Sequence, residues 1–159
     1  MSAAAALLAG AGVLIALLAA GCGAGRQDRG ATPARIAFER GGGFSGLVQG
    51  CALADDGTAE GWEQRPGQPR QAQWRAAPAG EGVAELARGL VEAAGDWQSE
   101  GAGNMTTRLS VQLGEIERRW SWAGFEAPEG APTAFAARLR DLQARCDAAR
   151  RAGLDTRPQ

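Results

Sequence analysis

The sequence predicts an α+β fold: an antiparallel sheet built from β-hairpins, with two amphipathic helices packed on it. Several short segments alternate apolar and polar residues, which is the period of a half-buried strand. Turn dipeptides that contain glycine separate pairs of these segments. Residues 81–97 and 133–149 instead repeat apolar residues every three or four positions, as the buried face of a helix does. Strands on one side of two helices make a two-layer α+β sandwich.

The first two predicted strands flank a run of glycines. Residues 34–40 alternate apolar and polar side chains, and the glycines at 41–43 end this pattern because glycine favours turns. A second strand is expected over residues 44–53. The Asp56-Gly57 dipeptide that follows predicts a tight hairpin turn, since both residue types tolerate the backbone angles of such turns.

The next stretch, residues 58–76, contains two tryptophans on either side of a proline-rich loop. Trp62 precedes and Trp74 follows residues 65–70 at similar distances along the chain. If that loop closes a hairpin, the two indole rings are expected to face each other across the paired strands.

The two predicted helices share the same pattern. The first is expected over residues 81–97, and the second begins near Thr133, a candidate N-cap that follows two prolines. Their expected inner faces are Val83, Leu86, Ala87, Leu90, Val91, Ala94 and Trp97 in the first, and Phe135, Leu139, Leu142, Cys146 and Ala149 in the second.

A further hairpin is predicted between residues 105–113 and 116–123. The two-residue loop Gly114-Glu115 begins with glycine, which suits a type II′ turn. This turn fixes the register and gives one face that is apolar except for a single arginine. The expected pairs are Leu113 with Ile116, Val111 with Arg118, Leu109 with Trp120, and Thr107 with Trp122.

Composition excludes several functions. The 17 basic and 18 acidic residues nearly cancel, so no net charge favours nucleic acid or an anionic membrane surface. There is no histidine, which removes Ser-His-Asp relays, Cys-His pairs and the usual zinc ligands. No paired carboxylates occupy a recognisable catalytic setting. We therefore expect a protein that is not an enzyme and that holds no cofactor and no metal ion.

The N-terminal segment has the features of an export signal. Residues 3–20 contain only Ala, Leu, Gly, Val and Ile. They lead into Leu-Ala-Ala-Gly-Cys at residues 18–22, which resembles the lipobox of bacterial lipoproteins. In those proteins the cysteine is acylated and becomes the first residue of the mature chain, so Cys22 is the expected lipidation site. A plain transmembrane anchor is the alternative, because about 20 apolar residues span a bilayer.

These features divide the chain into four parts. We expect a signal peptide over residues 1–21, a flexible tether over 22–33, an α+β domain over 34–151 and a tail over 152–159. A lipoprotein with this layout lies in the cell envelope. Acyl chains hold it to the membrane, and its domain faces the periplasm or the cell exterior.

Two cysteines remain once Cys22 is assigned to lipid. Cys51 falls on a predicted strand, and Cys146 falls on the inner face of the last predicted helix. In an oxidising compartment they can form a disulfide. The other interpretation, two small buried thiols that never meet, stays open.

The glycine run carries the most specific motif of the chain. Residues 36–47, Ile-Ala-Phe-Glu-Arg-Gly-Gly-Gly-Phe-Ser-Gly-Leu, resemble the opening of the emfourin family. That family shows an alternating apolar strand, a Gly-Gly-Phe turn, a small residue, then glycine and an aliphatic residue. Emfourins are small protein inhibitors of protealysin, a thermolysin-like zinc metallopeptidase. The matching residues are Gly42, Gly43, Phe44, Gly46 and Leu47.

The resemblance implies a membrane-tethered inhibitor of a thermolysin-like metallopeptidase. The turn would enter the peptidase cleft, and the partner-binding residues would be Gly42, Gly43, Phe44, Ser45 and Gly46. A purely structural interpretation is a hairpin turn with Phe44 folded back onto the core. The alternative function is an envelope lipoprotein that uses the same fold as a structural or assembly adaptor.

Overall fold

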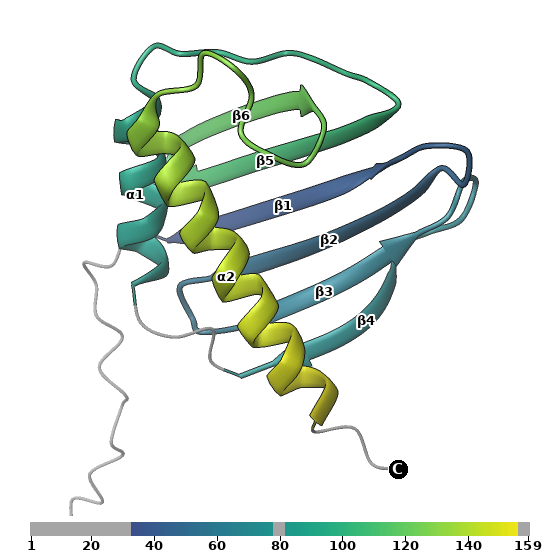
Figure 1. Cartoon of the computed structure of the whole chain (residues 1–159). Coiled ribbons are helices and arrows are strands. Elements are labelled where there is room, and N and C mark those ends of the chain that lie inside the picture. Colours follow the sequence, from purple (N-terminus) through teal and green to yellow (C-terminus); the bar gives the residue numbers. More distant parts are fainter. Residues whose placement is uncertain (1–32, 78–81, 156–159) are drawn as a thin grey trace, which may run out of the picture. The chain divides into compact units, whose positions relative to one another are not determined.

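A computed structural model describes residues 33–77 and 82–155 of the chain. Six antiparallel strands form one sheet in the order β4-β3-β2-β1-β5-β6, and two helices cover one of its faces (Figure 1). This confirms the α+β class. The elements are β1 (Ala34–Gly42), β2 (Leu47–Ala54), β3 (Ala59–Gln64), β4 (Gln71–Ala76), α1 (Val83–Ala94), β5 (Met105–Leu113), β6 (Ile116–Ala123) and α2 (Thr133–Asp155).

The expected signal segment, Cys22 and the tether up to residue 32 lie outside the described residues. Within the described part of the chain, neither helix is both long enough and apolar enough to cross a bilayer.

The central strand β1 shows how the sheet divides its two faces. Ile36 and Phe38 are buried on the face that the helices cover, as the alternating pattern predicted. Arg35 and Glu39 point to the opposite face, which we call the open face. Antiparallel pairing with β2 and β5 extends this division, because directly paired residues share a face.

Helix α2 runs diagonally across the helix-covered face (Figure 1). Its buried residues follow the spacing expected from the sequence: Phe135, Leu139, Leu142, Cys146, Ala149 and Gly153. The helix ends at Asp155, beyond residue 151, where the domain was expected to end. Gly153 explains the extension, since a Cβ there would lie only 2.7 Å from the carbonyl oxygen of Arg75 on β4. The last turn of α2 therefore packs directly on the sheet.

The β5–β6 hairpin confirms the predicted register at all four pairs. Gly114 has a φ of 61°, and no residue other than glycine has a positive φ in the described chain, which fits a type II′ turn. The arginine on the apolar face, Arg118, reaches the end of α1 and donates a hydrogen bond of 3.4 Å to the carbonyl oxygen of Gly95.

The β3–β4 hairpin forms as expected, but the prediction for its two tryptophans is wrong. Residues 59–61 pair with β4 one position away from the register that would join the two tryptophans, so Trp74 pairs with Gly61, and a bulge after Gly61 then pairs Trp62 with Ala72. The two indoles consequently lie on opposite faces of the sheet. Trp74 belongs to the core under the helices, whereas Trp62 covers Gly50 on the open face.

Candidate functional site

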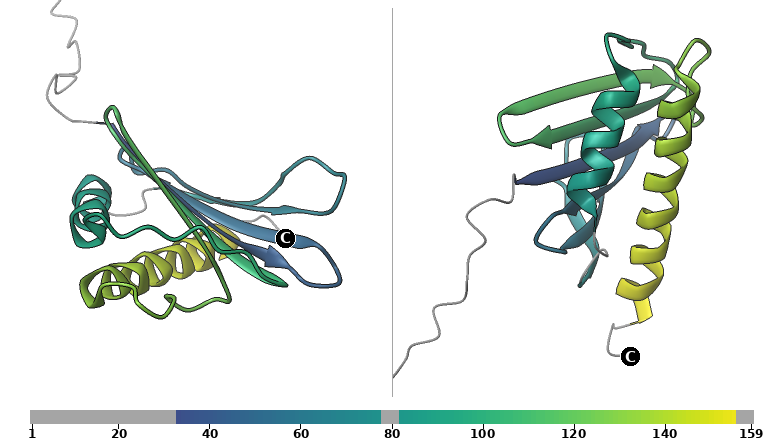
Figure 2. Two further views of the ribbon diagram at one scale, coloured as in Figure 1. Left: turned by 90° about the horizontal axis from the view of Figure 1, so that it is seen from above. Right: turned by 90° about the vertical axis from the view of Figure 1, so that its left-hand side faces the viewer.

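The β1–β2 turn, residues 43–46, lies at the end of the sheet that projects beyond the helices (Figure 2). Its backbone requires glycine. Gly42, Gly43 and Gly46 have φ values of 122°, 69° and 58°, which residues with a Cβ rarely adopt. At Gly42 space is also lacking, because a Cβ would lie 2.1 Å from the carbonyl oxygen of Asn104. The glycines of the motif are thus explained by the shape of the turn.

Neighbouring segments hold this turn on two sides. The N–H of Gly43 donates a 2.5 Å hydrogen bond to the carbonyl oxygen of Asn104, which precedes β5. Gly46 packs against the β3–β4 loop so closely that a Cβ there would lie 2.5 Å from Cγ of Pro66. Within the turn, the N–H of Leu47 donates to the hydroxyl of Ser45. These contacts fix the conformation of the turn.

Phe44 at the tip of the turn is fully exposed, with a relative accessibility of 109%. The interpretation with Phe44 folded onto the core is therefore wrong. The reason is that the turn projects past the helix layer, so no helix surface lies within reach of the ring (Figure 2). Ser45 is also exposed and belongs to the turn, because β2 begins only at Leu47.

An open hollow of about 440 Å³ lies beside the turn, and we call it the turn hollow. Apolar and polar side chains contribute to its wall together with the turn backbone. The lining residues are Arg40, Gly41, Gly42, Gly43, Ser45, Leu47, Gln49, Met105 and Phe125.

Arg40 is the charged group of the turn hollow. Its guanidinium carbon lies 4.6 Å from the ring centre of Phe38 and 5.5 Å from that of Phe125. One terminal nitrogen donates a 3.2 Å hydrogen bond to the carbonyl oxygen of Phe125, whereas the buried Nε finds no acceptor among the described residues. Burial lowers the pKa of Arg40 from its ordinary value, and the carboxylate of Asp147 opposes this shift. Arg40 remains protonated at any physiological pH.

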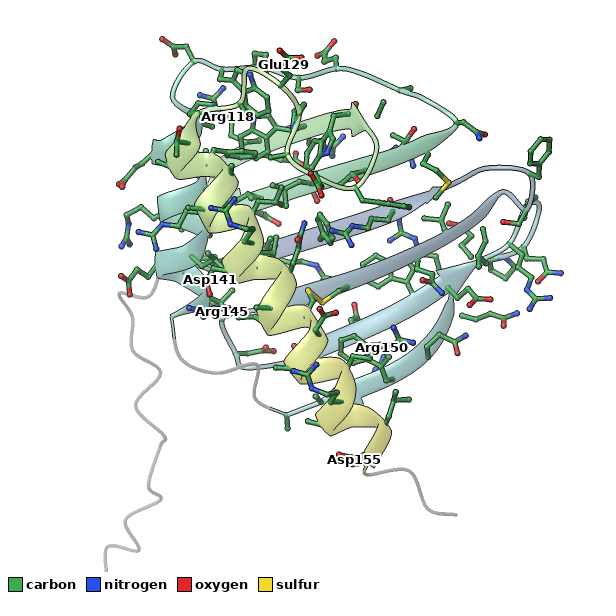
Figure 3. The ribbon with its side chains drawn as sticks, viewed as in Figure 1. Arg118, Glu129, Asp141, Arg145, Arg150 and Asp155 are labelled. Carbon is green, nitrogen blue, oxygen red and sulfur yellow. A yellow bond between two sulfur atoms is a disulfide. The ribbon has the colours of Figure 1, made fainter. Side chains whose placement is uncertain are left out.

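The described part of the chain also contains a hollow beneath α2, which Arg40 lines as well, and a hollow on the open face. The first, of about 290 Å³, runs between the sheet and the C-terminal half of α2, and the disulfide between Cys51 and Cys146 lies in its wall (Figure 3). The Cα atoms of these cysteines are 6.1 Å apart, so the structure adopts the bonded alternative. The other hollow, about 620 Å³, opens on the open face around Arg108. No group of three metal-ligating side chains occurs within residues 33–77 and 82–155.

No protein-family model matches this chain, and no curated protein matches it significantly. The candidate site is therefore defined by its own geometry.

The five expected site residues are consecutive in the chain: Gly42 is the last residue of β1, and the other four form the turn. Sequence reasoning missed Arg40, Met105 and Phe125, which complete the turn hollow. A signal existed for Arg40, since strand alternation places it on the same face as the buried Ile36 and Phe38. A charged residue on an apolar face is informative. No local pattern marks Phe125, which reaches the hollow through the β6–α2 loop.

Proposed function

We propose that this protein is a membrane-tethered binding protein whose β1–β2 turn enters the cleft of a thermolysin-like zinc metallopeptidase and inhibits it. One observation carries the proposal: an aromatic side chain, Phe44, stands fully exposed on a turn whose backbone is held in place. The residues that build this turn are those that resemble the emfourin family.

The physical basis of such inhibition is preorganisation. A turn fixed by Asn104 and Pro66 loses little conformational entropy when it binds, so more of the contact energy appears as affinity. Burying a phenylalanine ring in an apolar pocket contributes about 1.5 to 3 kcal/mol. The inhibitor needs no chemistry of its own, because a rigid turn that fills the cleft excludes substrate.

Inhibition assays with the full-length chain against several purified thermolysin-like peptidases test the proposal. We expect Phe44→Ala to weaken inhibition at least tenfold. Ile116→Ala is the matched control, since Ile116 is another exposed apolar residue, 50% accessible, next to the turn at the other end of the sheet. It should inhibit as the wild type does. A wild type that inhibits none of these peptidases would overturn the proposal in favour of the envelope adaptor, and equal inhibition by Phe44→Ala would place the contact elsewhere.

The tether is tested separately. If Cys22 is acylated, Cys22→Ser should release the chain from the membrane fraction or leave the signal segment uncleaved. Firm attachment needs more than one acyl chain, which a multiply acylated cysteine provides. Unchanged mass and unchanged membrane partitioning in the variant would exclude the lipid anchor.

A further inference from the structure

We propose that the turn hollow binds a carboxylate of the partner protein, and that Arg40 is the group that recognises it. This inference rests on the proposed function, which supplies the partner. It adds the chemical group that the partner presents beside the inserted turn. The inference itself comes from the surroundings of Arg40, a cation with an unused donor next to the turn.

Arg40 lacks the carboxylate partner that several arginines of the sheet have, and it is the one arginine of the described residues with a buried side-chain nitrogen that has no acceptor. On the open face, Arg35 forms an ion pair of 2.8 Å with Glu60, and Arg119 forms one of 2.6 Å with Glu117. Among the described residues Arg40 has no carboxylate within ion-pair distance. The acidic group that acts on it, Asp147 of α2, does so only through its longer-range field.

The aromatic contacts of Arg40 leave its N–H edge as the part that can bind a ligand. Two rings, Phe38 and Phe125, contact the guanidinium. One N–H is used by the carbonyl oxygen of Phe125, and Nε has no acceptor in the described chain. A buried donor without an acceptor is unfavourable, and a carboxylate satisfies an arginine edge with two oxygens in one plane. Because Nε is buried, a carboxylate in the hollow would bind the terminal nitrogens of Arg40, whose other N–H groups have no acceptor among the described residues.

The walls of the hollow define what accompanies the carboxylate. Leu47, Met105 and Phe125 provide apolar surface next to Arg40, and Phe125 is 45% exposed. The fitting ligand therefore has a carboxylate joined to a short apolar group. In a polypeptide partner this is an acidic side chain beside an apolar one, or a chain terminus that ends in an apolar residue.

The two methionines of the chain, Met1 and Met105, provide a direct assay, because Met105 lines the hollow. The full-length chain, labelled with ¹³C at the methionine methyl groups and placed in lipid nanodiscs, is titrated with 3-phenylpropionate. The matched probe is 3-phenylpropan-1-ol, which has the same ring and chain without the charge. We expect the carboxylate to shift the Met105 methyl signal and to bind at least tenfold more tightly than the alcohol.

Two variants assign the effect to Arg40. Arg40→Met keeps an unbranched apolar chain between the rings but loses the charge, and should bind the carboxylate no better than the alcohol. Arg108→Met is the control, since it removes an arginine from the open face, away from the turn hollow. It should bind both probes as the wild type does.

Equal binding of the two probes by the wild type overturns the inference, and this comparison holds even if Arg40→Met does not fold. Unchanged carboxylate binding by a folded Arg40→Met also overturns it. The assay contains no peptidase. Carboxylate binding without peptidase inhibition would therefore contradict the proposed function alone, and inhibition without carboxylate binding would contradict this inference alone.

Discussion

Aromatic side chains are buried in the helix-covered part of the sheet and exposed at its projecting turn end. Under the helices, Trp122 and Phe135 are completely buried. At the turn end Phe44 is fully exposed and Phe125 is nearly half exposed. The apolar contacts that stabilise the fold are thus concentrated in one part of the molecule, and apolar groups available for recognition are presented by the other. Substitutions in the two parts should accordingly separate stability from binding.

The covered part gains its stability from aromatic packing and from a covalent link. Phe135 of α2 packs against Trp97 and Trp120, with ring centres 5.0 and 5.3 Å apart. The indole N–H of Trp120 donates to the carbonyl oxygen of Trp97. The disulfide joins α2 to β2 across 95 residues of sequence. These contacts do not involve the turn.

Removal of the disulfide should have the largest effect. In the chain-entropy model, a link across about 95 residues contributes about 4 to 5 kcal/mol. We expect the double variant Cys51→Ala/Cys146→Ala to lose about this much free energy of unfolding in urea titrations. At temperatures where it stays folded, it should inhibit as the wild type does.

Thiol titration of the denatured, unreduced wild type checks the bond itself. Neither Cys51 nor Cys146 should react, and two free thiols from this pair would show that the bond is absent. Loss of inhibition by the Cys51→Ala/Cys146→Ala variant at temperatures where it stays folded would contradict the separation of stability from binding.

Alanine substitutions at the glycines of the turn end should differ in how much stability they cost. Gly42→Ala meets both an unfavourable φ and the carbonyl oxygen of Asn104, so we expect a loss of about 2 to 4 kcal/mol and weaker inhibition. Gly67, in the β3–β4 loop, has a φ of 70° but nothing within 4 Å of its would-be Cβ. Gly67→Ala should cost about 1 kcal/mol and leave inhibition unchanged. Equal losses in thermal melts of the two variants would show that crowding at Gly42 contributes nothing.

How far the sequence predicts this molecule depends on whether a feature is local. The β5–β6 hairpin was predicted to the residue, because the Gly114-Glu115 turn and the alternation of its strands agree. The buried face of α2 was predicted for the same reason, since a helical period is contained in one segment. The expected contact between the two tryptophans of the β3–β4 hairpin is wrong, because the strands pair one residue away from the register that would join them, and no local sequence pattern indicates this offset.

The candidate site shows the same limit. The sequence predicted the turn from its glycines, and Gly42, Gly43 and Gly46 adopt positive φ values in the structure. The exposure of Phe44 was not predictable, because it depends on how far the helices extend over the sheet (Figure 2). The turn hollow depends on the β6–α2 loop folding back to place Phe125 beside Arg40, which is a tertiary contact between residues far apart in sequence.

A smaller effect concerns the β2–β3 turn, where a carboxylate rather than glycines alone holds the backbone. Asp56 accepts hydrogen bonds from the backbone N–H of Thr58 at 2.8 Å and from its hydroxyl at 2.7 Å. These bonds lower the pKa of Asp56 below its ordinary value. A carboxylate with a lowered pKa stabilises the fold above its unfolded-state pKa, and this contribution is lost as the pH falls through the folded-state value.

We therefore expect the stability difference between the wild type and Asp56→Ala to shrink in acid. Urea titrations between about pH 6 and about pH 2 measure it. A difference that stays constant over this range would mean that the charge of Asp56 does not contribute. Inhibition should not change, because this turn lies at the opposite end of β2 from the glycine turn.

The smallest effect on stability and a large effect on binding should come from Ser45→Arg. Ser45 is exposed, and its one contact in the turn is a long hydrogen bond of 3.3 Å from the N–H of Leu47, so the melting curve should stay within about 0.5 kcal/mol of the wild type. The added bulk lies beside Phe44 and should weaken inhibition at least tenfold, which is about 1.4 kcal/mol. Gln112→Arg is the control, since it adds the same charge at an exposed position near the other end of the sheet. If both variants inhibit equally well, bulk at the turn does not matter and the partner contacts another surface. If both lose inhibition equally, added charge rather than the shape of the turn is responsible.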